Sequence, residues 1–61
     1  MPGYRLFYFE RGHIAGVRVI HSEDEALAVE EGRKIAGNQE AELWRGTERI
    51  KAFNRPNVQS G

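Results

Sequence analysis

Residues 4–21, YRLFYFERGHIAGVRVIH, are typical of a β-hairpin and set the pattern of the chain. The segment 4–10 is rich in aromatic residues and contains neither Gly nor Pro, as expected for a strand. Arg11 and Gly12 follow, and glycine tolerates the positive φ that a two-residue hairpin turn requires. The segment 14–21 supplies the β-branched residues of a second strand. The sequence therefore predicts two antiparallel strands joined by a two-residue turn.

A helix is predicted over residues 23–36. Ser22 can cap its first turn, and Glu25 three residues later completes a capping box. Gly37 is a suitable left-handed terminator. The face expected to be buried is made of small residues, and Leu27 is expected at its edge. The members of this face are Ala28, Val29, Gly32, Ile35 and Ala36. Because Gly32 weakens the helix, its presence indicates a close approach of the helix to a sheet.

A second hairpin is predicted over residues 41–53, AELWRGTERIKAF, with Gly46 and Thr47 in a type II′ turn. The order hairpin, helix, hairpin predicts an α+β fold of the ββαββ type. In this fold the two hairpins form one four-stranded sheet, and the single helix packs on one face. Residues 1–54 are predicted to form one domain, and residues 55–61 a flexible C-terminal tail. The sequence leaves the strand order open.

Two-residue turns fix which residues face each other across each hairpin. In the second hairpin, one predicted face is apolar and holds Ala41, Leu43, Ile50 and Ala52. The other pairs Glu42 with Lys51 and Trp44 with Arg49. In the first hairpin, the predicted core face holds Tyr4, Leu6, Tyr8, Ala15, Val17 and Val19, and the other holds Arg5, Phe7, Phe9, Ile14, Arg18 and Ile20. The second set is placed outside, because it would otherwise bury two arginines side by side.

The predicted sheet face opposite the helix is too apolar for an ordinary solvated surface. We expect it to form an interaction surface whose residues are Arg5, Phe7, Phe9, Ile14, Arg18, Trp44, Arg49, Lys51 and Phe53. The chain has no net charge, but segment 22–36 carries five acids and two bases, and the remainder balances at +3. The sequence thus predicts an acidic helix side and a basic, aromatic sheet side.

The 61 residues limit the chain to one domain, and no run approaches the roughly 20 apolar residues of a membrane span. There is no signal-peptide pattern, and we expect a cytoplasmic protein. Cysteine is absent, which excludes disulfides, thiolate zinc sites and thiol catalysis. A domain of this size buries only about 60% of its unfolded surface, which favours oligomerisation.

Catalytic and metal chemistry find little support in the sequence. His13 and His21 have no cysteine or second histidine at zinc-ligand spacing, so we interpret them as polar residues at the ends of elements. The acids of the helix are interpreted as a solvated face, and Ser22 as a cap rather than a nucleophile. We therefore expect no enzymatic activity, no metal and no cofactor.

The favoured hypothesis is a non-enzymatic interaction module that forms a homodimer or docks a protein partner through the aromatic and basic sheet face. The alternative is a small RNA- or single-stranded-DNA-binding protein using the same face, with aromatic rings on bases and arginines on phosphates. A third reading has the C-terminal tail folded over the aromatic residues.

The chain resembles a group of short bacterial proteins for which no activity is established. The resemblance lies in the opening Tyr4-Arg5-Leu6-Phe7-Tyr8-Phe9 after Met1-Pro2, the Gly12-His13-Ile14 turn, the acidic helix start and the Glu42-Leu43-Trp44 hairpin. It covers residues 1 to about 53. It implies a small bacterial ββαββ protein and supplies no catalytic residue.

Overall fold

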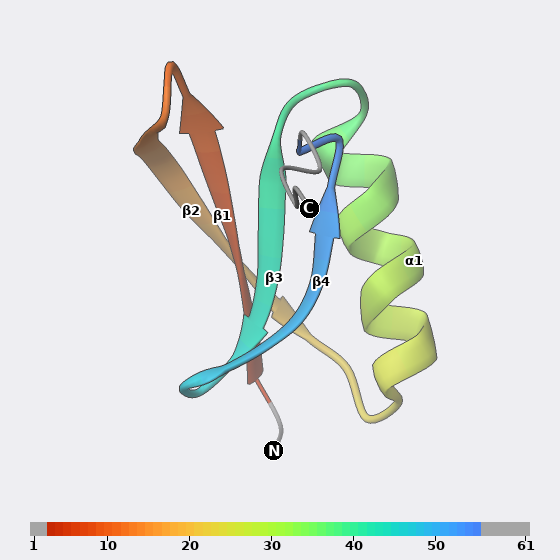
Figure 1. Cartoon of the computed structure of the whole chain (residues 1–61). Coiled ribbons are helices and arrows are strands. Elements are labelled where there is room, and N and C mark those ends of the chain that lie inside the picture. The colour runs from red at the N-terminus through yellow and green to blue at the C-terminus, as the bar shows by residue number, and fades with distance from the viewer. Residues whose placement is uncertain (1–2, 56–61) are drawn as a thin grey trace, which may run out of the picture.

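The computed structural model describes residues 3–55 and has the predicted ββαββ order. Its elements are β1 (Gly3–Glu10), β2 (His13–His21), α1 (Glu25–Ala36), β3 (Ala41–Arg45) and β4 (Glu48–Phe53). The four strands form one antiparallel sheet, and α1 lies across one of its faces (Figure 1). The predicted α+β fold is confirmed. Of the tail predicted at residues 55–61, only Arg55 belongs to the described residues.

The strand order is β2-β1-β3-β4, so β1 and β3 are central and the other two strands form the edges. β1 pairs with β3 from Arg5 opposite Trp44 to Tyr8 opposite Ala41. α1 runs back along the sheet and returns the chain to the end at which β2 began (Figure 1). β2 and β3 are therefore parallel to each other but separated by β1, which settles the order that the sequence left open.

Both hairpins have the predicted two-residue turns. Arg11 and Gly12 have φ angles of 53° and 82°, as a type I′ turn requires, and Gly46 has a φ of 61° at the first turn position. The sequence therefore predicted the positions of both turns correctly.

α1 begins two residues later than predicted, at Glu25, because Asp24 rather than Ser22 is the N-cap. The Asp24 carboxylate accepts a hydrogen bond from the backbone N–H of Ala26 at 2.9 Å. The Ser22 hydroxyl instead donates to the backbone carbonyl of Asp24 at 2.9 Å. The helix ends as predicted at Ala36, and Gly37 takes a φ of 59°.

The core lies between α1 and the sheet, and its buried members are Tyr4, Leu6, Ile20, Ala28, Ala36, Ala41, Leu43 and Phe53. Gly32 is buried among them, and a Cβ atom at this position would lie 3.3 Å from the Phe53 ring and 3.5 Å from Leu6. The predicted close approach of helix and sheet at Gly32 is confirmed. The small helix face thus allows the sheet residues to provide the large core side chains.

A β-bulge in β2 overturns the predicted faces of this strand. Ile14 opposes Phe9 and Gly16 opposes Tyr8, so Ala15 is an extra residue without a partner. Beyond this point the alternation is reversed, because one inserted residue turns every following side chain to the other face. Ile20 is consequently buried, whereas Val17 and Val19 are each 52% exposed. The predictions that these valines lie in the core and that Ile20 lies outside are wrong.

A second bulge has the same effect in β4. Trp44 opposes Arg49 as predicted, but Leu43 opposes Lys51 and Ala41 opposes Phe53, so that Ile50 is the extra residue. Phe53 is therefore buried under the helix. Ala52 is exposed, contrary to its predicted place in the core. The prediction that Phe53 lies on the surface opposite the helix is wrong.

Candidate interaction surface

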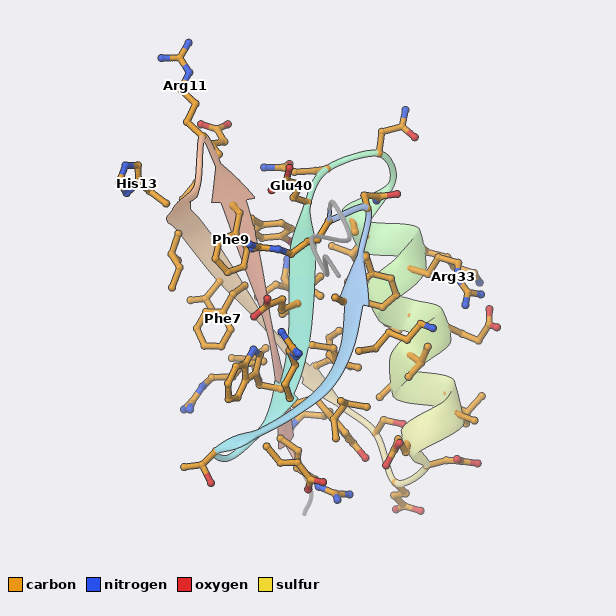
Figure 2. The ribbon with its side chains drawn as sticks, viewed as in Figure 1. Phe7, Phe9, Arg11, His13, Arg33 and Glu40 are labelled. Atoms are coloured by element: carbon orange, nitrogen blue, oxygen red, sulfur yellow. The ribbon has the colours of Figure 1, made fainter. Side chains whose placement is uncertain are left out.

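The sheet face opposite α1 carries a cluster of aromatic and aliphatic side chains, which we call the outward face. Its members are Arg5, Phe7 and Phe9 of β1, Ile14, Val17 and Val19 of β2, Glu42 and Trp44 of β3, and Arg49 and Ala52 of β4. Figure 2 shows Phe7 and Phe9 on the side of the sheet away from the helix. No described helix packs on this side of the sheet, so its apolar side chains are in contact with water unless another molecule covers them.

Two rings of the central strands form the middle of the outward face. Phe7 and Trp44 meet edge to face, with ring centroids 6.4 Å apart and an interplanar angle of 84°. The indole N–H of Trp44 donates to the Glu42 carboxylate at 3.0 Å. This hydrogen bond fixes the orientation of the indole ring, and both rings are half-buried. The centre of the face is thus ordered before any partner binds.

Glu42 organises the charges of the outward face. Its carboxylate accepts a hydrogen bond from Arg49 at 3.4 Å and lies 3.7 Å from Nε of Arg55. The Arg55 guanidinium also stacks over the Phe9 ring, 4.1 Å from its centroid. Since Glu42 is only 9% exposed, these contacts compensate a carboxylate that is largely removed from water.

Arg55 is a contributor that the sequence reading missed, because it was assigned to the tail. Its Nη1 atom is buried without a hydrogen-bond partner among the described residues. The only sequence signal is a cation two residues beyond the last strand of an aromatic-rich sheet, which is too common to be specific.

Six of the nine residues predicted for the interaction surface lie on the outward face: Arg5, Phe7, Phe9, Ile14, Trp44 and Arg49. The other three lie on the helix side, because they follow the two bulges. Arg18 opposes the buried Leu6, Lys51 opposes the buried Leu43, and Phe53 is part of the core. The basic character expected for this face is accordingly reduced, while Val17 and Val19 extend its apolar part to the β2 edge.

The turn between β3 and β4 is linked to the helix through Arg45. Its guanidinium contacts the Glu48 carboxylate at 3.3 Å and lies 3.8 Å from that of Glu25 at the start of α1. The hydrogen bond to Glu48, followed by interactions with Tyr4, raises the pKa of Arg45 above its ordinary value. Arg45 thus joins the β3–β4 turn to the first turn of α1 through two exposed ion pairs.

The groups that the sequence analysis considered for metal and catalytic chemistry have the following positions. His13 and His21 are exposed. Within residues 3–55, no three His, Asp or Glu side chains are grouped closely enough to hold a metal ion. In the same part of the chain, no helix is long and apolar enough to cross a membrane. No family model, curated protein or solved structure matches the chain. The resemblance to short bacterial proteins stays a prediction.

Proposed function

We propose that this chain is a non-enzymatic protein-interaction module, which forms a homodimer or docks another protein through its outward face. The observation that carries this proposal is the continuous apolar strip from Phe7 and Trp44 to the β2 edge. There Ile14 is 60% exposed, and Val17 and Val19 are each 52% exposed. A monomer gains nothing from keeping large aliphatic side chains in water, whereas an interface buries them.

The ordered centre of the outward face supports the same proposal. Phe7 and Trp44 are held against each other, and Glu42 fixes the indole ring. Aromatic side chains that are ordered before binding lose little conformational entropy in a complex and are common energetic centres of protein interfaces. The partly exposed arginines around them suit the polar rim of such an interface.

Binding of single-stranded RNA or DNA is the second candidate function. It is favoured by the position of Phe7 on β1 and Trp44 on β3, since aromatic residues on central strands can stack on bases. It is weakened by the charges. Arg49 and Arg55 already contact Glu42, and Arg18 lies on the helix side. Few cations of the described residues therefore remain to bind phosphates, which dominate nucleic-acid affinity.

A photo-crosslinking experiment tests the proposed function. A benzoylphenylalanine residue replaces Phe7 on the outward face or, as a matched control, Lys34 on the exposed side of α1. Irradiation in a bacterial cytoplasm, where we propose that the module acts, is expected to give a discrete protein adduct from position 7. The adduct would contain a second copy or one other protein, identified by mass spectrometry. Position 34 is expected to give none.

Two results would contradict the proposal. If positions 7 and 34 gave the same diffuse set of adducts, the outward face would have no preferred protein partner. If a labelled single strand quenched the fluorescence of Trp44, the only tryptophan, with a steep salt dependence, the nucleic-acid alternative would replace it.

A further inference from the structure

The apolar side chains left in water are concentrated along one border of the sheet. Four large aliphatic residues of the described chain are more than half exposed: Ile14, Val17, Val19 and Leu27. The first three belong to β2, which is an edge strand. Leu27 belongs to α1 and lines a groove between the helix and β2. Exposed apolar groups therefore flank β2 on both faces of the sheet.

The backbone of β2 is also available along this border. The Phe9 N–H donates to the Glu40 carbonyl at 2.9 Å, so the backbone groups of Phe9 point toward β3. Because these groups alternate along a strand, those of Tyr4 and Leu6 point toward β2. Their partners there are Ile20 and Arg18.

The intervening residues of β2, Val17 and Val19, must therefore direct their N–H and C=O groups to the open side. Such a row of unpaired backbone groups is a template for a further strand.

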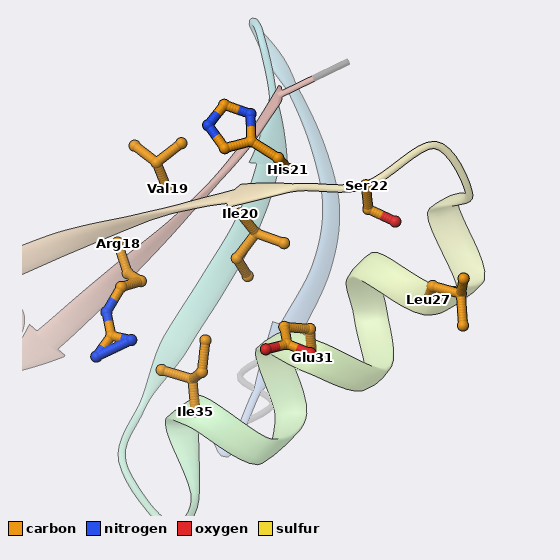
Figure 3. A pocket seen from close by; sticks show the side chains of 8 residues that line it. All are labelled: Arg18, Val19, Ile20, His21, Ser22, Leu27, Glu31 and Ile35. Carbon is orange, nitrogen blue, oxygen red and sulfur yellow. The ribbon is translucent and has the colours of Figure 1, made fainter. Parts of the chain in front are cut away.

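The groove beside this edge contains two opposite charges that are not paired with each other. It has a volume of about 260 Å³ and is lined by Arg18 and Ile20 of β2 and by Leu27, Glu31 and Ile35 of α1 (Figure 3). Within residues 3–55, neither Arg18 nor Glu31 takes part in an ion pair. A surface that offers both a free cation and a free anion is complementary to itself when it is repeated by a two-fold axis.

We propose that a second copy of this chain pairs antiparallel along β2, with the two-fold axis at Val19, so that the two sheets become one continuous sheet. This inference rests on the proposed function in taking a second copy as a partner of the module, and it places their contact at the β2 edge rather than at the centre of the outward face. Each copy satisfies the backbone groups of the other at this edge, and the exposed valines of both strands become cross-strand neighbours.

Charge and backbone geometry favour this register over axes at Arg18 and at Val17. An axis at Arg18 would place two guanidinium groups opposite each other, and like charges across a strand pair are destabilising. An axis at Val17 would run the partner strand into the bulge at Ala15. An axis at Val19 uses only the regular residues 17–21 and places Arg18 opposite Ile20 of the second copy. Ile20 lines the groove that contains Glu31, so each Arg18 approaches the Glu31 of the other copy.

Pairing at the β2 edge leaves the centre of the outward face free. Phe7 and Trp44 lie on β1 and β3, away from the shared edge, and stay exposed to the same extent. The outward faces of the two copies then join side by side into a wider surface. Self-association through the edge and docking through the outward face are thus separable properties.

Disulfide trapping tests the register directly, because the chain contains no cysteine. In the Val19→Cys variant, the two new residues face each other across the axis at a Cα separation of about 5.5 Å, within the range that a disulfide spans. Val17→Cys is the matched control, since it has the same residue type and the same exposure on the same strand. Its two copies would be about 13 Å apart along the strands, too far to bridge. Mild oxidation is expected to give a covalent dimer of the first variant only.

An exchange of the charges of Arg18 and Glu31 tests their contact across the dimer in the protein without introduced cysteines. The Arg18→Glu variant is expected to dissociate about tenfold more readily in sedimentation equilibrium, since two reciprocal pairs become repulsive. The double variant Arg18→Glu, Glu31→Arg restores both pairs in exchanged order and is expected to recover the wild-type dissociation constant. Circular dichroism confirms that each variant is folded.

Three outcomes would overturn the inference. They are a strict monomer at high micromolar concentration, preferential trapping at Val17, and a dimer that is weakened by Trp44→Ala but not by Arg18→Glu. The last outcome would leave the proposed function standing, because the dimer would then use the outward face. A strict monomer whose photo-crosslinker at position 7 still captures another protein would overturn the β2-edge dimer and leave the proposed function standing. If neither the disulfide-linked dimer nor a photo-crosslinked protein formed, the proposed function would be overturned as well.

Discussion

The reversed faces of β2 predict that two adjacent residues differ strongly in their effect on stability. Ile20 is 5% exposed and packs in the core, whereas Val19 next to it is 52% exposed on the outward face. An unbroken hairpin register would give the opposite arrangement, with Val19 in the core. Replacing each residue by alanine therefore tests the bulge at Ala15 directly.

The expected losses follow from burial. Truncation of a buried isoleucine to alanine costs about 2–5 kcal/mol, and Ile20 should fall near the lower end, because the neighbouring groove lets the site relax. We expect Ile20→Ala to lower the free energy of unfolding by about 2–3 kcal/mol. Val19→Ala removes half-exposed methyl groups and should cost about 0.5 kcal/mol. A domain of this length has a total stability of about 3–9 kcal/mol, so the first change should remove a large part of it.

Urea unfolding followed by Trp44 fluorescence measures both values, and thermal unfolding provides an independent reading. A loss of 2–3 kcal/mol corresponds to a lowering of Tm by about 10–20 °C in a domain of this size. All chains should be compared as monomers, at a protein concentration well below the dissociation constant of the wild-type dimer, because Val19 lies at the proposed dimer axis and self-association would otherwise add to the measured stability. A larger loss for Val19→Ala than for Ile20→Ala, or equal losses for both, would refute the assignment of the β2 faces.

Further predictions concern the central strand, the bulge and the outward face. Leu43→Ala should lower the free energy of unfolding by about 2–5 kcal/mol, because Leu43 is fully buried. Trp44→Ala should change stability less than Leu43→Ala and should weaken the docking of another protein at the outward face, without weakening self-association at the β2 edge. Equal urea midpoints for Leu43→Ala and Trp44→Ala would contradict the outward position of the ring. Deletion of Ala15 should preserve cooperative thermal unfolding, because the pairs on both sides stay in register, whereas deletion of Val17 should abolish it. Glu42→Gln should cost about 1 kcal/mol, because it removes the charge that attracts Arg49 and Arg55, and should shift the Trp44 emission. Unchanged emission would show that the carboxylate does not hold the indole.

Much of the candidate surface was predictable because β1 is a regular strand. Phe7 and Phe9 occupy the face expected from simple alternation, and Trp44 and Arg49 lie next to the turn, before the bulge has any effect. Arg18, Lys51 and Phe53 lie beyond the bulges and were assigned to the wrong face. Arg55 could not be found, since its contact with Phe9 joins residues that are distant in sequence.

The sequence by itself determined the elements, because their causes are local. Alternating apolar residues define the strands, Gly12 and Gly46 permit the turns, and Gly37 ends the helix. Local chemistry also placed Gly32 on the face of α1 that approaches the sheet. These features depend on residues a few positions apart, and a single sequence contains that information.

Only the tertiary structure decided the strand order and the two bulges. An extra residue is tolerated in a strand when the packing on both sides gains from it. In this protein the gain is the burial of Ile20 and Phe53 against a helix that is distant from them in sequence. Since this gain arises from contacts between distant segments, neither hairpin contains a local signal for it. The same packing left Val17 and Val19 in water at an open sheet edge, and it thereby produced the surface on which the proposed contacts depend.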